Sequence, residues 1–279
     1  MPGVGIPVAD RPYGDSVLVG ADMQLTLEGK TKDQVAIERI QAFEPPEGYY
    51  LAFSGGKDSV TLLALAKMAG VKFDAHYNLT TVDPPPLVKF IREQHPEVEI
   101  VRPKKTMWQL IDEHGTLPTR MVRFCCEDLK EVGGVGRLCL TGIRWAESPR
   151  RANRNLLEMD KRRKNKRFLH PILDWTDDDV WQYIRERNLP YCSMYDEGWK
   201  RLGCVLCPMA APSSIQREIE RFPKIVRAWH NAALRVYQRG GKMSHWQSGD
   251  DYFNWWLSRE GLRDSQQATF YDCMVPFSD

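Results

Sequence analysis

Short apolar runs alternate with amphipathic stretches through the middle of the chain. Five runs have the length and composition of buried strands: 49–53, 71–79, 98–101, 138–143 and 168–173. Five stretches have helical character: 31–43, 60–68, 87–94, 126–132 and 174–187. Strands that alternate with helices pair in parallel through right-handed crossovers. The pattern therefore predicts an α/β fold with a doubly wound, mostly parallel sheet.

The two ends of the chain differ from this middle part. Residues 1–30 hold Gly and Pro with little periodicity, which predicts an irregular N-terminal lead-in. After about Pro208 the sequence is helical in pattern and rich in Trp. We therefore predict an α/β domain at 31–210 and a helical C-terminal subdomain at 211–279. The helical spacing of the tryptophans favours core packing over stacking on nucleic-acid bases.

Composition narrows the class of protein. The 279 residues include 39 Lys and Arg against 37 Asp and Glu, a net charge of +2 that excludes a strongly basic protein. The longest apolar stretch, 60–71, contains Lys67 and falls short of the ~20 residues of a membrane span. No signal peptide is visible. Seven cysteines, an odd number, indicate a reducing compartment. We expect a cytoplasmic protein with no membrane partner.

A glycine-rich loop follows the predicted strand at 49–53. Its six residues are Ser54, Gly55, Gly56, Lys57, Asp58 and Ser59, and they open the next predicted helix. The glycines let the backbone approach a ligand closely, and the amides at the start of a helix attract an anion. Hydroxyl groups and the Lys57 ammonium add further donors. The order of residues does not fit a Walker loop, so the loop predicts a different phosphate site.

The loop resembles the pyrophosphate-binding (PP) loop of the adenine nucleotide alpha hydrolase superfamily, whose members cleave ATP between the α and β phosphates. Five further segments extend the resemblance towards the phosphoadenosine phosphosulfate reductase family: 141–148, 170–175, 179–181, 195–198 and 203–204. The resemblance covers about residues 30–210. It implies a doubly wound α/β domain with the nucleotide at the carboxyl ends of the strands.

The resemblance also implies roles for particular residues. Catalysis falls to four of them: Lys57, Asp58, Arg144 and Glu147. Nucleotide binding falls to the six loop residues and to Gly142, Arg144, Arg150 and Arg151. Thr80 and Asp83 follow the second predicted strand, at an edge that meets the adenosine in this fold. Turn chemistry ahead of three prolines explains Thr80 and Asp83 equally well.

Four cysteines form the second chemical signal. Cys125 and Cys126 are adjacent, and Cys204 and Cys207 form a Cys-x-x-Cys motif. Four thiolates can hold a structural zinc ion or a [4Fe–4S] cluster, and buried apolar cysteines are a further explanation. Adjacent cysteines suit the separate corners of a cluster better than one tetrahedral ion. The pattern resembles the iron–sulfur sulfonucleotide reductases; ligation by three cysteines, with Cys125 or Cys126 free, stays open.

Two departures from the reductases bear on function. Their phosphate loop is degenerate, whereas the loop here is intact, as in relatives that consume ATP. Their catalytic cysteine lies in a Glu-Cys-Gly-Leu-His tail that is absent here, where the one C-terminal thiol is Cys273. Packing of the apolar tail around Cys273 is the simpler explanation of that residue.

The leading hypothesis is an enzyme that uses ATP and Mg²⁺ to adenylate an acceptor for sulfur transfer assisted by a [4Fe–4S] cluster. One alternative is a sulfonucleotide reductase that releases sulfite, with Cys273 as nucleophile. Another is a nucleotide-binding redox regulator without turnover. Expected partners are an adenine nucleotide, a sulfur or electron donor protein and a second copy of the chain. The basic run Lys161–Arg167 is either a solvated loop or a contact for a nucleic-acid acceptor.

Overall fold

A computed structural model describes residues 29–160, 166–240 and 245–258. Six strands form one sheet in the order β3-β2-β1-β4-β6-β5. Their bounds are β1 (Tyr49–Ala52), β2 (Phe73–Asn78), β3 (Glu99–Val101), β4 (Leu138–Leu140), β5 (Leu157–Met159) and β6 (Arg167–Leu169). All neighbouring strands pair in parallel except β5, which runs antiparallel to β6. The predicted α/β fold with a doubly wound, mostly parallel sheet is confirmed.

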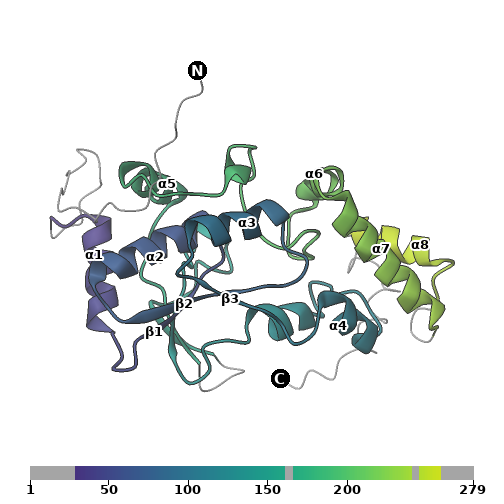
Figure 1. Ribbon diagram of the computed structural model, residues 1–279, viewed down its shortest axis with the longest axis horizontal. Coiled ribbons are helices and arrows are strands. Elements are labelled where there is room, and N and C mark those ends of the chain that lie inside the picture. Colours follow the sequence, from purple (N-terminus) through teal and green to yellow (C-terminus); the bar gives the residue numbers. More distant parts are fainter. Residues whose placement is uncertain (1–28, 161–165, 241–244, 259–279) are drawn as a thin grey trace.

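Helices cover both faces of this sheet. Five of them belong to the α/β part: α1 (Lys32–Ala42), α2 (Lys57–Ala69), α3 (Pro85–Gln94), α4 (Met107–His114) and α5 (Asp177–Glu186). Helices α1, α2, α3 and α5 lie on one side of the sheet and α4 lies on the other (Figure 1). As predicted, Thr176 caps α5: its hydroxyl accepts the amide hydrogen of Asp179 at 3.2 Å.

The structure departs from the predicted elements at several places. The strand predicted at 168–173 ends at Leu169 as β6, and residues 171–174 form turns. The strand predicted at 138–143 stops at Leu140, because residues 141–143 leave the sheet and line a cavity. The helix predicted at 126–132 is one wide turn, η1 (Cys126–Lys130). Helix α4 and strand β5 were not predicted. Strand β5 does not follow the usual apolar pattern of a strand. Its two apolar residues, Leu157 and Met159, are exposed, and Glu158 between them is half-buried.

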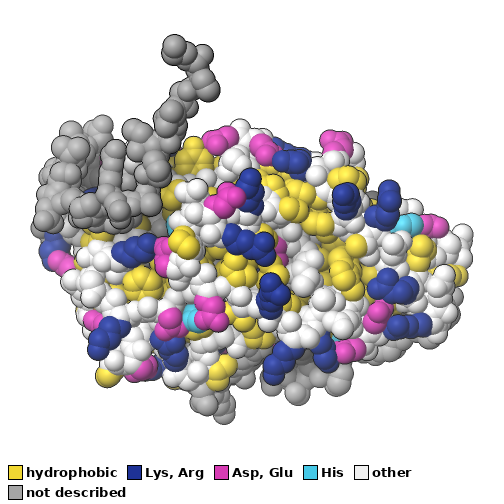
Figure 2. Space-filling view, in the orientation of Figure 1, with side chains coloured by type: hydrophobic (Ala, Val, Ile, Leu, Met, Phe, Trp, Pro, Cys, Tyr) yellow, Lys and Arg dark blue, Asp and Glu magenta, His cyan; other side chains and the backbone are white. Residues whose placement is uncertain are grey.

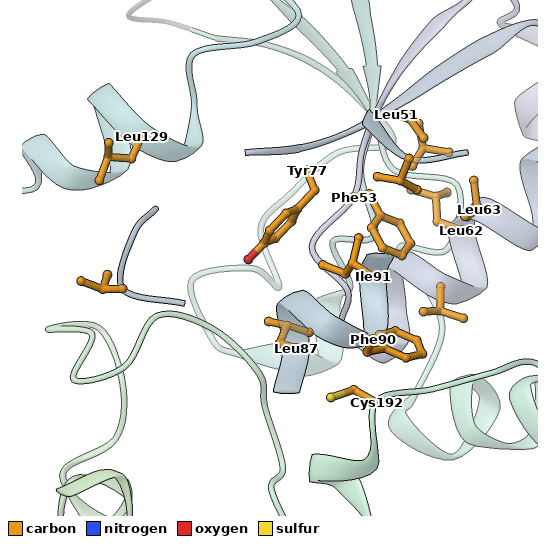
Figure 3. Close-up of a cluster of buried hydrophobic side chains, with 14 of the residues drawn as sticks. Leu51, Phe53, Leu62, Leu63, Tyr77, Leu87, Phe90, Ile91, Leu129 and Cys192 are labelled. Carbon is orange, nitrogen blue, oxygen red and sulfur yellow. The ribbon is translucent and has the colours of Figure 1, made fainter. Parts of the chain in front are cut away.

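The core lies between the sheet and α2 and α3. Figure 3 shows Leu51 and Phe53 of the β1 segment against Leu62 and Leu63 of α2, with Phe90 of α3 nearby. Two cysteines outside the paired ones also lie in the interior. Cys139 is buried within β4, and Cys192 is buried close to Phe90 (Figure 3). Both behave as small apolar side chains, which agrees with the usual burial of free cysteine.

Three helices follow the α/β part: α6 (Ile215–Arg221), α7 (Pro223–Gln238) and α8 (Gly249–Ser258). Helix α7 packs on α8 and on α4. Trp229 and Trp256 are buried at their contact, and their indole N–H groups donate to the carbonyl oxygens of Val205 (3.2 Å) and Pro118 (2.7 Å). These two tryptophans are therefore core residues, as their spacing predicted. The domain boundaries at 30 and 210 stay predictions.

The surface carries charges of both signs. On the face shown in Figure 2, Lys and Arg side chains are interspersed with Asp and Glu. This mixture matches the small net charge of the sequence. In the described parts of the chain, no helix has both the length and the apolar character that a membrane span requires.

Candidate active site

A polar cavity of about 440 Å³ lies where β1 and β4 end at their carboxyl edge. Three segments supply most of its wall: the loop 54–59, the segment 141–147 after β4, and the segment 195–202. Lys130, Arg151 and Asp177 complete the polar lining. In open α/β sheets, ligands bind outside the carboxyl ends of the strands. The cavity therefore occupies the position expected for a nucleotide.

The glycine-rich loop makes one wall of this cavity. Gly55 has φ +72°, and a Cβ atom there would lie 2.6 Å from Leu87 and 2.8 Å from Ile91 of α3. The loop needs glycine at this position both for its backbone angle and for its packing. Gly56 directly precedes α2, so the N-terminus of this helix lies at the cavity. The Ser59 hydroxyl donates to the carbonyl oxygen of Gly56 at 2.8 Å, which holds the turn closed.

Two buried cations meet two carboxylates at the loop. The Lys57 ammonium lies 3.2 Å from Asp58 and 3.3 Å from Asp177. Arg144 is 1% exposed; its Nε donates to Asp58 at 2.7 Å, and its guanidinium also pairs with Asp177. Burial opposes the charge on Arg144, yet the two carboxylates outweigh it and raise the pKa of the guanidinium. Asp58 and Asp177 thus hold the Lys57 and Arg144 side chains in place at the cavity.

The segment after β4 brings further predicted residues into the cavity. A Cβ atom at Gly142 would lie 2.9 Å from the carbonyl oxygen of Asp58, so glycine permits the close contact between this segment and α2. Glu147 accepts the amide hydrogen of Arg144 at 3.0 Å and pairs with Arg151. Glu147 therefore holds the backbone at Arg144 and the side chain of Arg151.

Three predicted nucleotide contacts lie elsewhere. Thr80 and Asp83 are buried and bond to each other, the Thr80 amide donating to the Asp83 carboxylate at 2.6 Å. The Thr80 hydroxyl lies 3.3 Å from the sulfur of Cys204, so this turn adjoins the cysteines and is absent from the cavity lining. Arg150 is exposed and is also absent from that lining.

Several lining residues were not among the predicted ones. They are Lys130, Thr141, Asp177, Tyr195, Lys200 and Arg201. Tyr195, Lys200 and Arg201 lie in or just after the matched segment 195–198, which was the available signal for them. Asp177 was interpreted as a helix-start residue only. The Thr141 hydroxyl lies 2.6 Å from Nδ1 of His170, a fully buried ring whose pKa burial lowers to about 4.

The four paired cysteines lie close enough to influence one another. Cys125 and Cys126 share a hydrogen bond, and Cys204 and Cys207 both raise the pKa of the Cys125 thiol further. The bond from Cys125 and the nearby Arg123 lower the pKa of the Cys126 thiol to about 6. Lys130 follows the pair on η1, and the charge of Cys204 raises its pKa. Because Lys130 also lines the cavity, the cysteines and the cavity are neighbours.

The Cys-x-x-Cys turn is anchored from both sides. The Val205 amide donates to the carbonyl oxygen of Val82 at 2.9 Å, and the Leu206 amide donates to the buried Glu218 of α6. Leu206 has φ +57°, a left-handed conformation that these contacts maintain. The turn is therefore held in place by contacts with Val82 and with α6.

A zinc ion and a [4Fe–4S] cluster place different demands on the four paired cysteines. Among the described residues, no three His, Cys, Asp or Glu side chains converge closely enough to hold a metal ion. A single zinc needs all its sulfurs at about 2.3 Å. A [4Fe–4S] cluster takes its cysteines on separate irons, and the cations Arg123 and Lys130 suit its negative charge. The arrangement of the four thiols shows neither group, and the [4Fe–4S] cluster stays a prediction from the sequence pattern.

Replacing Lys57 by alanine is expected to weaken nucleotide binding by roughly 10- to 150-fold. The change removes a charge-assisted contact of about 1.5–3 kcal/mol from the loop. Titration calorimetry with ATP and with adenosine 5′-phosphosulfate measures the effect. Lys89→Ala, on an exposed lysine of α3, is the matched control. Unchanged affinity of the Lys57 variant for both nucleotides would place the site elsewhere.

Residues 48–210, more than half of the chain, match the phosphoadenosine phosphosulfate reductase domain family. An uncharacterized protein of Methanocaldococcus jannaschii is 31% identical over 200 residues, which are 67% of this chain and 41% of that protein. The adenosine 5′-phosphosulfate reductase of Staphylococcus haemolyticus is 30% identical over 169 residues, 55% of this chain and 68% of that enzyme.

Among solved structures, a phosphoadenylyl-sulfate reductase of Candida auris in complex with phosphate is 20% identical, with a TM-score of 0.46. The match covers 65% of this chain and 97% of that one. The named sequence relatives are enzymes that act on sulfonucleotides, as the resemblance noted in the sequence implied. The match over residues 48–210 shows that this chain belongs to the phosphoadenosine phosphosulfate reductase domain family.

Proposed function

We propose that the chain is a sulfonucleotide reductase, which binds an adenylyl sulfate in the cavity and releases sulfite. The observation that carries the proposal is the cation-lined cavity within the family region, with the cysteines as its neighbours. Relatives named adenosine 5′-phosphosulfate reductase support this function over ATP-dependent adenylation, the leading hypothesis from the sequence.

The lining residues suit a nucleotide with two adjacent anionic groups. Six basic side chains line the cavity against three carboxylates, so an excess of positive charge faces the ligand: Lys57, Lys130, Arg144, Arg151, Lys200 and Arg201 against Asp58, Glu147 and Asp177. Lys57 and Arg144 are nearly inaccessible to water, which strengthens their attraction for an anion. These groups would bind the α-phosphate and the sulfate group attached to it, and they would stabilise AMP as the leaving group.

The reduction itself needs a thiolate. The thiolate attacks the sulfur atom of the bound adenylyl sulfate, the bond from sulfur to the phosphate oxygen breaks, and AMP leaves with the electron pair. One thiolate of a dithiol donor protein then attacks the cysteine sulfur and displaces sulfite. The second donor thiol breaks the resulting mixed disulfide, which regenerates the cysteine thiol and leaves the donor as a disulfide. Cys139 and Cys192 are buried in the core and do not line the cavity. Cys273, the sequence candidate for the nucleophile, lies outside the described residues.

The four paired cysteines would hold the [4Fe–4S] cluster that the family resemblance implies. Cys125, Cys126, Cys204 and Cys207 would be its ligands, with Lys130 between them and the cavity. When bound, such a cluster supplies a negatively charged, polarisable group beside the sulfonucleotide. The side chains of the cavity wall do the binding and orienting.

A second candidate function is ATP-dependent adenylation, because the sequence of the loop Ser54–Ser59 is that of an intact pyrophosphate loop. In that reaction an acceptor oxygen attacks the α-phosphorus of Mg²⁺-bound ATP, and pyrophosphate leaves into the loop. A nucleic-acid acceptor would meet the basic run Lys161–Arg167, of which only Lys166 and Arg167 are described. The Lys166 ammonium is turned to the carbonyl oxygen of Glu131, at 3.0 Å.

One experiment separates these functions. Protein prepared without air is incubated with adenosine 5′-phosphosulfate and a dithiol donor, or with ATP and Mg²⁺. Mass spectrometry then identifies the products. Sulfite and AMP are expected from the first incubation. Pyrophosphate from the second, without sulfite from the first, would replace the reductase by the adenylating enzyme, and turnover of neither nucleotide would favour the redox regulator.

A further inference from the structure

A tyrosine side chain from a distant part of the chain forms a hydrogen bond with the phosphate loop. The Tyr195 hydroxyl accepts the amide hydrogen of Lys57, the first residue of α2, at 2.9 Å. The same oxygen lies 3.4 Å from the position that a Cβ atom would take at Gly56. It therefore stands directly over the start of the helix, where an anion would otherwise approach the amide.

Packing holds Tyr195 in this position. Its ring meets Trp181 of α5 edge to face, with ring centres 4.9 Å apart, and Tyr191 flanks both rings. Its backbone amide donates to the carbonyl oxygen of Cys192 at 3.0 Å, and its carbonyl oxygen accepts the amide hydrogen of Gly198 at 2.9 Å. To leave the loop, the side chain must give up the contact with Trp181. The hydroxyl is thus a fixed occupant, unlike a water molecule.

The hydroxyl also stays neutral beside the loop. Burial raises the pKa of Tyr195 far above neutrality, and the charges of Asp58 and Asp177 act in the same direction. The cavity lining includes Tyr195, so a bound nucleotide meets this side chain. A phosphate placed at the Lys57 amide and the phenol oxygen would compete for one N–H group, because each accepts the same hydrogen.

We propose that Tyr195 selects the nucleotide: by occupying the Lys57 amide, it disfavours the pyrophosphate group of ATP and leaves the cavity to the shorter sulfonucleotide. This inference rests on the proposed reductase function and deepens it. It explains how an intact pyrophosphate loop can occur in an enzyme whose substrate brings no pyrophosphate. Lys57 and Arg144 still offer side-chain charge to the anionic groups of a sulfonucleotide, which need not reach the amide.

The test compares binding to Tyr195→Phe and to the parent protein. Calorimetry measures the affinity of the full chain for inorganic pyrophosphate, for ATP and for adenosine 5′-phosphosulfate. Loss of the hydroxyl frees the Lys57 amide and keeps the ring packed on Trp181. Pyrophosphate and ATP are expected to bind at least roughly tenfold more tightly, or about 1.4 kcal/mol. The affinity for adenosine 5′-phosphosulfate should change less than about twofold.

Tyr191→Phe is the matched control, since that hydroxyl donates to Asp196 at 3.0 Å outside the cavity lining. It should leave all three affinities unchanged. Tyr195→Leu, which removes ring and hydroxyl together, gives a second route to the freed amide if Tyr195→Phe folds poorly. Equal or weaker binding of pyrophosphate in the Tyr195 variants would overturn the proposal, since the hydroxyl would then be neutral or a donor to the ligand.

Failure of the proposed function gives a different result. If the parent protein releases pyrophosphate from ATP and no sulfite from adenosine 5′-phosphosulfate, the reductase assignment fails. The ratio of the pyrophosphate affinities of Tyr195→Phe and the parent protein is a binding measurement. It therefore reports on the Lys57 amide whichever reaction the enzyme catalyses.

Discussion

Arg144→Ala is expected to lower nucleotide affinity by at least roughly tenfold and to destabilise the fold by about 1–3 kcal/mol. The guanidinium is buried and holds Asp58, Asp177 and the carbonyl oxygen of Trp175. Its removal takes a cation from the ligand and leaves the Asp58 carboxylate with one partner fewer. The pair with Asp177 adds little to the stability effect, because the side chain of Asp177 is 66% exposed and water screens its charge.

Calorimetric titration and thermal denaturation measure the two effects of Arg144→Ala separately. A loss of 1 kcal/mol in a chain of this size lowers the melting temperature by roughly 2–4 °C. Arg185→Ala, on an exposed arginine of α5, is the control and should change neither quantity. A variant that melts early yet binds ATP and adenosine 5′-phosphosulfate like the parent would restrict Arg144 to a structural role.

Protein purified without air is expected to contain iron and acid-labile sulfide in equal amounts, about four of each per chain. Cys204→Ser should lose nearly all of both, because Cys204 lies in the anchored turn and adjoins Cys207, Lys130 and Thr80. Metal analysis and the visible absorption spectrum measure the loss. The physical reason is the replacement of a thiolate ligand by a hydroxyl group, which iron–sulfur clusters bind poorly.

Cys192→Ala is the control for Cys204→Ser, since Cys192 packs in the core beside Phe90 (Figure 3). That variant should keep its iron. Zinc in place of iron would remove the cluster from the proposal. A full cluster in Cys125→Ser, lost in Cys126→Ser, would instead indicate ligation by three cysteines.

Local sequence patterns predicted the helices and strands whose formation depends on neighbouring residues. The run 49–53, the two glycines and the apolar face of 60–68 correspond to β1, the loop and α2, because strand, turn and helix preferences agree there. Thr176 marked the start of α5 for the same reason. Strand β5 was missed, since the alternation of a strand of only 3 residues is too short to stand out in the sequence. Helix α4 was missed although local signals mark both of its ends, the capping box of Thr106 with Gln109 and the terminal Gly115.

The amino-acid sequence by itself determined the fold class, the phosphate loop and the two cysteine pairs, because each depends on neighbouring residues. Only the tertiary structure decided what these parts meet. It placed Thr80 beside Cys204, Asp177 between Lys57 and Arg144, and the Tyr195 hydroxyl on an amide 138 residues earlier in the chain. Such contacts join segments through the packing of the sheet and its helices, and no local pattern encodes the distance between them.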